Sequence, residues 1–69
     1  MYVLRYPDGR SASQASYRLI DVATDMANRL ARREAGRTQQ RVAIEVWWAN
    51  DAGVPKMVER TVYAPPTAP

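Results

Sequence analysis

The 69-residue sequence contains neither cysteine nor histidine, and these two absences remove most of the chemistry that a small domain can perform. No disulfide can support the core, and the usual ligands of a zinc site are missing. Nucleophile pairs of the Ser-His or Cys-His kind cannot form either. We therefore expect no metal site, no cofactor and no catalytic residue, and we interpret the chain as a binding protein and not as an enzyme.

Glycine is scarce, and long apolar runs are missing. Gly9, Gly36 and Gly53 are the only glycines, and each lies where a turn is expected, so the sequence has no glycine-rich loop that would cradle a phosphate. No stretch approaches the roughly 18 consecutive apolar residues that mark a membrane-spanning helix. These absences favour a cytoplasmic protein that does not enter a membrane.

The charged residues favour bases over acids. Ten Lys and Arg residues against seven Asp and Glu residues give a formal net charge of +3, and Lys56 is the only lysine. Arginine makes planar, bidentate contacts with carboxylates and phosphates. A charge of +3 is compatible with binding to nucleic acid but is too small to require it.

Three segments are expected to form strands. Aromatic and β-branched residues alternate over residues 2–6, and the Pro-Asp-Gly sequence at 7–9 ends that strand. Residues 41–49 and 54–63 show the same two-residue alternation. The loop between them, 51–53, has the length and the final glycine of a common hairpin turn.

That loop length also predicts the register of the hairpin. It would place Val46 opposite Val58 and Val42 opposite Val62, which gathers the valines on one face of the sheet. The residues expected to face the core from this hairpin are Val42, Ile44, Val46, Val58 and Val62.

A single helix is expected over residues 12–35. Ser11 or Ser13 would cap its N-terminus, and Gly36 would end it. Apolar residues recur at three- and four-residue spacing, which indicates one buried stripe. The stripe consists of Leu19, Ile20, Ala23, Met26, Ala27, Leu30 and Ala31.

These elements predict an α+β fold of β-α-β-β order, with one amphipathic helix packed on a three-stranded sheet. A right-handed crossover would make the first two strands parallel, and we favour the third strand between them. Residues 1–64 would form one domain. The proline-rich residues 65–69 have nothing to bury and are expected to be a disordered tail.

The sheet face away from the helix is the first candidate binding surface. In the expected register Trp47 and Met57 are neighbours across strands, and an exposed Trp beside a Met is typical of a contact surface. Glu45 would face Glu59, and this acidic pair is a possible binding site for a basic side chain of a partner. We expect a monomer or a weak homodimer. The candidate protein-binding residues are Trp47, Met57, Tyr63, Glu45 and Glu59.

A basic cluster is the second candidate surface and supports an alternative function, direct binding of DNA or RNA. It runs from the end of the expected helix into the next strand. Asp21 and Asp25, one helical turn apart, are interpreted as solvated charges beside Arg18 and Arg29. The candidate residues for nucleic acid or an acidic surface are Arg29, Arg32, Arg33, Arg37 and Arg41.

As a whole, the chain resembles the compact anti-CRISPR proteins of bacteriophages and mobile elements. The resemblance rests on a short, cysteine-free α+β unit, residues 1–64, without catalytic residues and followed by a tail that is expected to be disordered. It implies an inhibitor in the cytoplasm of a bacterial host, which binds a subunit of a CRISPR effector and blocks target-DNA entry or nuclease recruitment. Many such proteins are acidic DNA mimics, and the +3 charge of this chain departs from that pattern.

Overall fold

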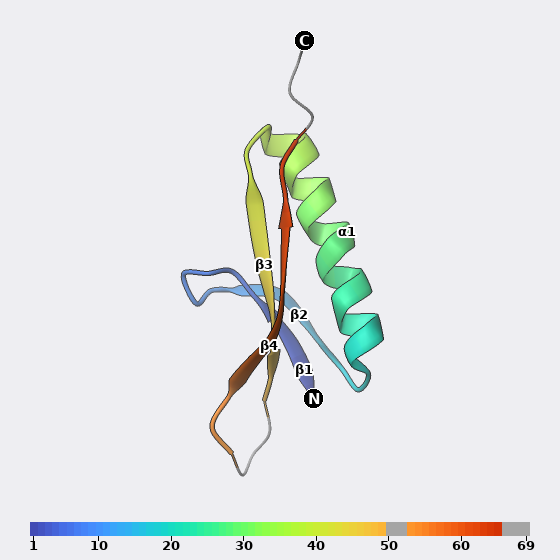
Figure 1. Ribbon diagram of the computed structural model, residues 1–69, viewed down its shortest axis with the longest axis vertical. Helices are drawn as coiled ribbons and strands as arrows, with labels where there is room; N and C mark the ends of the chain where they lie inside the picture. The colour runs from blue at the N-terminus through green and yellow to red at the C-terminus, as the bar shows by residue number, and fades with distance from the viewer. Residues whose placement is uncertain (50–52, 66–69) are drawn as a thin grey trace.

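Four strands and one helix follow one another in the order β-β-α-β-β (Figure 1). The computed structural model describes residues 1–49 and 53–65. The fold class is α+β as expected, but four strands form the sheet where three were expected. The elements are β1 (Tyr2–Arg5), β2 (Ser11–Tyr17), α1 (Ile20–Thr38), β3 (Val42–Trp48) and β4 (Lys56–Tyr63).

Two expectations lie mainly outside the described residues. Of the hairpin loop expected at 51–53, the described part is Gly53. Of the tail expected at 65–69, the described part is Pro65.

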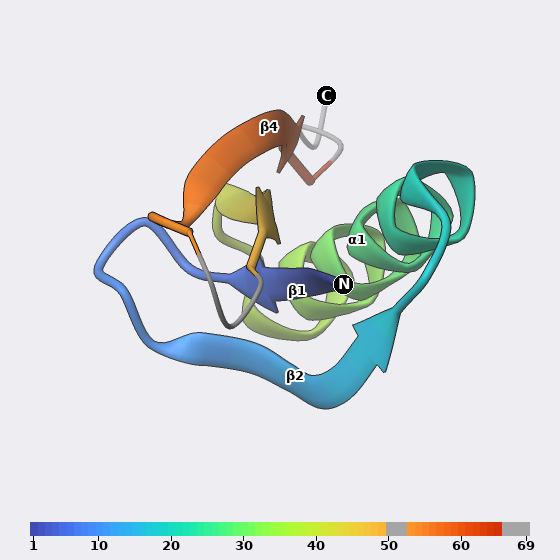
Figure 2. The ribbon, with the colours of Figure 1, turned by 90° about the horizontal axis from the view of Figure 1, so that it is seen from below.

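Neighbouring strands all run antiparallel, in the order β2-β1-β3-β4. Helix α1 covers one face and packs chiefly on β3 and β4, and no described element covers the other face (Figures 1 and 2). The expected parallel orientation of the first strand and residues 41–49 is therefore wrong, and the last strand lies at the sheet edge and not between the other two. The cause is β2, which reverses the chain before the helix. Helix α1 thus connects β2 to β3, two parallel strands with β1 between them.

Strand β2 occupies the first part of the expected helix, so the prediction of a helix from residue 12 is wrong. A tight turn sends the chain back beside β1. The Tyr6 N–H donates to the Arg10 carbonyl, and the Gly9 N–H donates to the Tyr6 carbonyl, both at 2.9 Å. Gly9 has a φ of 94°, a conformation that glycine adopts without steric penalty. Asp8-Gly9 therefore closes a hairpin.

Helix α1 begins and ends later than expected. Its N-cap residue is Leu19, whose backbone is extended and whose side chain makes no cap hydrogen bond, so neither Ser11 nor Ser13 caps the helix. Gly36 lies inside the helix and does not end it. The C-cap residue is Gln39, which takes the left-handed conformation with a φ of 57°.

The core is a layer to which the strands contribute large side chains and the helix contributes small ones. Leu4, Ile44 and Val46 are fully buried on the sheet side. Leu19 and Ile20, expected in the buried stripe, are instead 64% and 38% exposed because they lie at the N-terminal end of the shortened helix. The helix contributes four buried alanines at four-residue spacing, which bring one side of it close to the sheet. They are Ala23, Ala27, Ala31 and Ala35.

The β3–β4 register follows the expectation near the hairpin loop and departs from it further along. Trp47 lies opposite Met57, as expected. An extra residue in β4, Val58, then interrupts the ladder as a β-bulge does. Beyond it the pairing is shifted by one residue, so that Val46 faces Glu59 and the expected pairing of Val46 with Val58 is wrong.

The shift removes a contact between like charges. Glu45 faces Arg60 instead of another glutamate, and opposite charges across strands stabilise a sheet where like charges destabilise it. The same shift pairs Val42 with Tyr63, which packs against the core. Val62 turns outward and is 42% exposed, so the expectation that it belongs to the core is wrong.

Candidate functional site

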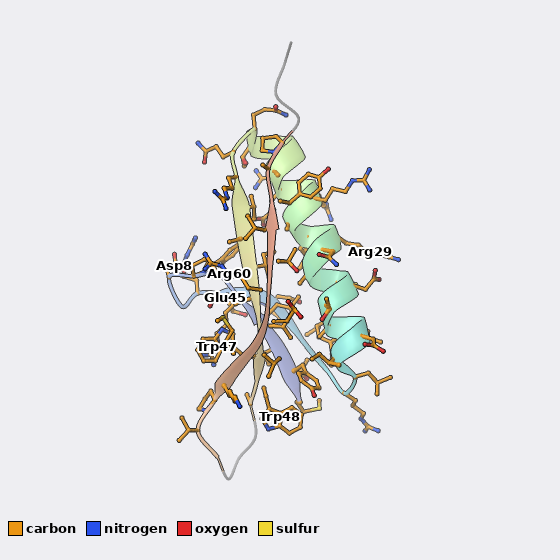
Figure 3. All side chains as sticks on the ribbon, viewed as in Figure 1. Asp8, Arg29, Glu45, Trp47, Trp48 and Arg60 are labelled. Carbon is orange, nitrogen blue, oxygen red and sulfur yellow. The ribbon has the colours of Figure 1, made fainter. Side chains whose placement is uncertain are left out.

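The uncovered sheet face presents a preorganised tryptophan, Trp47 of β3. Its indole N–H donates to the Glu45 carboxylate at 3.0 Å. The Arg5 guanidinium, from β1, lies over the indole ring at 5.2 Å from the centroid, within range of a cation–π interaction. Figure 3 shows Glu45 and Trp47 on the side of the sheet away from α1. We refer to Arg5, Glu45 and Trp47 as the Trp47 triad.

Residues of β4 and β1 extend the surface around the triad. Met57 lies opposite Trp47 and is 44% exposed. Arg60 lies opposite Glu45, and Val3 of β1 pairs with Trp47 on its other side. The result is an apolar centre bordered by charges of both signs. Protein interfaces commonly have this arrangement of an apolar core and a polar rim.

Two residues expected on this surface lie elsewhere. Tyr63 packs against the core, and Glu59 lies opposite buried Val46 beside the β4 irregularity. Sequence reasoning missed Arg60, because the expected register, with Val58 and Val62 facing the core, directed residue 60 toward the helix. The structure therefore brings together three of the five expected residues, Glu45, Trp47 and Met57, and adds Arg5 and Arg60.

The five arginines of the expected basic cluster are divided between two grooves and the exposed helix surface. Arg29 and Arg32 border a shallow groove beside β4, and Arg29 pairs with Asp25 at 3.0 Å. Arg41 borders a different groove, next to the β1–β2 turn. The other two, Arg33 and Arg37, are exposed on α1.

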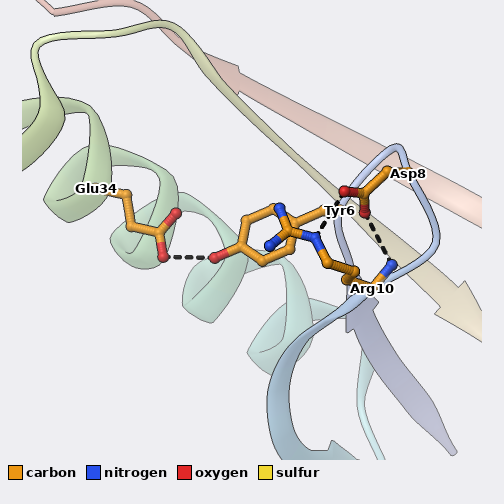
Figure 4. A network of polar contacts seen from close by, with 4 residues as sticks. All are labelled: Tyr6, Asp8, Arg10 and Glu34. Atoms are coloured by element: carbon orange, nitrogen blue, oxygen red, sulfur yellow. Dashed lines mark hydrogen bonds and ion pairs between the residues drawn. The ribbon is translucent and has the colours of Figure 1, made fainter.

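The groove that Arg41 borders lies between the β1–β2 turn, the C-terminal end of α1 and the first residues of β3. Its volume is about 520 Å³, and we call it the β3-edge groove. One side is organised by a polar network (Figure 4). The Tyr6 hydroxyl donates to the Glu34 carboxylate at 2.5 Å, and the Arg10 guanidinium lies over the Tyr6 ring at 5.0 Å. Arg10 also pairs with Asp8 at 2.6 Å.

These contacts shift two ionisations. The hydrogen bond to Glu34, together with burial, raises the pKa of the Tyr6 phenol above its ordinary value. The hydrogen bonds from Arg10 to Asp8 lower the pKa of that carboxyl. Both carboxylates of the groove wall, Asp8 and Glu34, are therefore engaged with groups of the protein itself.

The Tyr6 ionisation predicts a loss of stability at high pH. Because the folded-state pKa is raised, the Tyr6–Glu34 hydrogen bond contributes fully below the unfolded pKa of about 10 and is lost as the pH rises through the folded value. We expect Tyr6→Phe to lower the free energy of unfolding by about 1 kcal/mol near pH 8. Above the raised pKa the difference between the two proteins should shrink. Urea unfolding of both proteins, near pH 8 and again above the raised pKa of Tyr6, measures the difference in their free energies of unfolding. A difference that does not change with pH would contradict the role of the Tyr6–Glu34 hydrogen bond.

The fold and its surfaces define a small α+β domain with one helix on one face of an antiparallel sheet. Comparisons with protein-family models, with curated proteins and with solved structures found no match. In the described ranges, no helix is long and apolar enough to cross a membrane. Among the same residues, no group of three or more acidic side chains gathers to hold a metal ion.

Proposed function

We propose that the protein is a non-enzymatic binding protein that docks on a partner protein through the Trp47 triad and Met57. The observation that carries the proposal is the preorganised tryptophan on a sheet face that no described element covers. Its indole N–H is bonded to Glu45 and its ring is held by Arg5, so little side-chain freedom is lost when a partner covers it.

The chemistry of the surface matches that of protein interfaces. Trp and Arg are the side chains that most often dominate binding energy, and they do so near the centre of a contact. Met57 adds a flexible, polarizable neighbour that adapts to the shape of a partner. Arg60 and the flanking strand residues supply a charged rim.

The resemblance to anti-CRISPR proteins extends the proposal to a partner. In this extension, the partner is a subunit of a CRISPR effector in a bacterial host, and the protein blocks target-DNA entry or nuclease recruitment by occupying space. The net charge of +3 favours contact with a protein surface over mimicry of DNA. Support for the extension is the size and composition of the chain and its uncovered, tryptophan-centred surface.

Trp47→Ala should weaken partner binding at least about tenfold, because a tryptophan at the centre of a contact carries a large share of its binding energy. The measurement is capture of effector subunits by tagged protein from nuclease-treated lysate of a CRISPR-competent bacterium. A parallel assay counts plaques of a phage that this CRISPR system targets. Wild-type protein should restore plaques, and Trp47→Ala should not.

Leu19→Ala is the matched control. Leu19 is a large apolar side chain, 64% exposed at the start of α1 and outside the Trp47 triad, so its removal should leave capture and plaque counts unchanged. Equal losses in both variants would contradict docking through Trp47. The alternative is direct binding of DNA or RNA. It would be supported if capture of the effector subunits depended on nucleic acid, fell steeply with salt and required the arginines of the basic cluster. Those arginines are Arg29, Arg32, Arg33, Arg37 and Arg41.

A further inference from the structure

One edge of β3 is left without a partner strand near its beginning. Strand β1 pairs with β3 from Tyr2↔Trp48 to Arg5↔Glu45 and goes no further. On β1, the next residue whose N–H would point toward β3 is Pro7, which has no N–H. At this point the chain turns toward β2. The first residues of β3 therefore have β4 on one side and, within residues 1–49 and 53–65, no strand on the other.

The backbone of Ala43 is directed toward this open side. In an antiparallel ladder, alternate residues direct both N–H and C=O to the same neighbour. The Ala49 N–H donates to the Met1 carbonyl at 2.9 Å, so the odd-numbered residues of β3 face β1. Ala43 shares that parity but lies beyond the end of β1. Its N–H and C=O thus face the β3-edge groove, which Ala43 lines.

The side chains that line the groove carry one positive charge in excess. Its lining holds Arg10, Arg41 and Arg60 against Asp8 and Glu34, and three minus two gives +1. Arg10 and Asp8 pair with each other. Arg41 and Arg60 form no ion pair with any other described residue. Two guanidinium groups are therefore available at the rim of a concave, partly apolar site.

We propose that the β3-edge groove binds an extended acidic peptide segment. The segment adds a short strand at Ala43, and its single carboxylate is held by Arg41 and Arg60. A peptide strand complements both the donor and the acceptor of Ala43, whereas a phosphate offers acceptors alone. The two carboxylates of the groove wall also disfavour a run of phosphates, while the excess of +1 matches one acidic side chain. This inference does not rest on docking through Trp47, although Arg60 belongs to both surfaces, and Arg41 belongs to the groove alone.

The probe is a panel of fluorescein-labelled heptapeptides, each with β-branched residues around one central Asp or Glu. Binding is measured by fluorescence anisotropy and by amide shifts in ¹⁵N spectra of the full chain. We expect at least one peptide to bind and to move the Ala43 amide signal. Replacing its acidic residue by the amide, or introducing Arg41→Ala or Arg60→Ala, should weaken binding about tenfold. Arg18→Ala, an exposed arginine outside the groove, should have no effect.

Ala43→Pro separates strand addition from simple attraction of an anion. It removes an N–H that no described strand uses, at an edge where proline is tolerated, so the fold should persist while peptide binding is lost. Unchanged binding in a folded Ala43→Pro variant would overturn the inference. So would a panel without any binder, or tighter binding of an oligothymidine than of every peptide. If Ala43→Pro does not fold, slower hydrogen exchange of the wild-type Ala43 amide on peptide addition supports the inference, and unchanged exchange overturns it.

Discussion

Val46→Asp is expected to unfold the protein at neutral pH. Val46 is fully buried between Leu4 and Ile44 of the sheet and the alanines of α1. The substitution forfeits about 1.5–3 kcal/mol of apolar burial. It also leaves an uncompensated carboxylate in the core, which costs several kcal/mol more. A core of this size rarely supplies more than about 3–5 kcal/mol in total. Circular dichroism should therefore show loss of both helix and strand signals.

Val22→Asp is the matched control, because it makes the same chemical change at an exposed site. Val22 is 46% exposed in the first turn of α1. A carboxylate there interacts favourably with the helix dipole, by about 0.3–1 kcal/mol. This variant should fold and be at least as stable as wild type in urea. A folded Val46→Asp protein, or two variants of equal stability, would contradict the described core.

The sequence predicted correctly those elements whose apolar residues repeat with a regular period. The alternation in 2–6 and 41–49 gave β1 and β3, and the three- and four-residue spacing identified three of the four buried alanines of α1, Ala23, Ala27 and Ala31. The Trp47–Met57 pair was also correct, because it lies close to the hairpin loop, where loop length determines register.

Strand β2 could not be recognised from its own residues. Ser11–Tyr17 reads SASQASY, which lacks apolar alternation and begins with serines that resemble a helix cap. Its identity as a strand comes from pairing with β1, a tertiary property. The available signal was Asp8-Gly9, a typical hairpin dipeptide, which we had interpreted only as the end of a strand.

The departure in register beyond Trp47 changes which charges face each other across the strands, and periodicity alone does not predict it. A regular ladder would have set Glu45 against Glu59, and one extra residue in β4 replaces that contact with Glu45 against Arg60. This change created much of the candidate site. It brought Arg60 to the outer face and moved Tyr63 to the core.

The β3-edge groove was beyond sequence reasoning for a different reason. It exists because β1 pairs only with residues 45–48 of β3 and leaves the first residues of β3 without β1 as a neighbour, and the extent of pairing between two strands emerges only when the register is known. Arg10 and Arg60 are far apart in the chain and belong to no common motif. Their meeting in one groove follows from the order of the strands.

Ala27→Leu is expected to lower the free energy of unfolding by more than about 2 kcal/mol, at the upper part of the range for overpacked cores. Ala27 is fully buried in the middle of the alanine row of α1, facing the large side chains of β1 and β3. Small residues at four-residue spacing let the helix lie close to the sheet. A leucine there must push α1 away or take a strained rotamer, because the neighbouring space is already filled.

Asn28→Leu places the same side chain on the exposed surface of the next helical position. Leucine has a higher helix propensity than asparagine, so this control should be as stable as wild type or slightly more stable. Urea unfolding of the two variants therefore tests how closely α1 packs on the sheet, and not the helix propensity of the substituted residue. If Ala27→Leu is as stable as Asn28→Leu, the helix does not lie against the sheet as closely as its four buried alanines indicate.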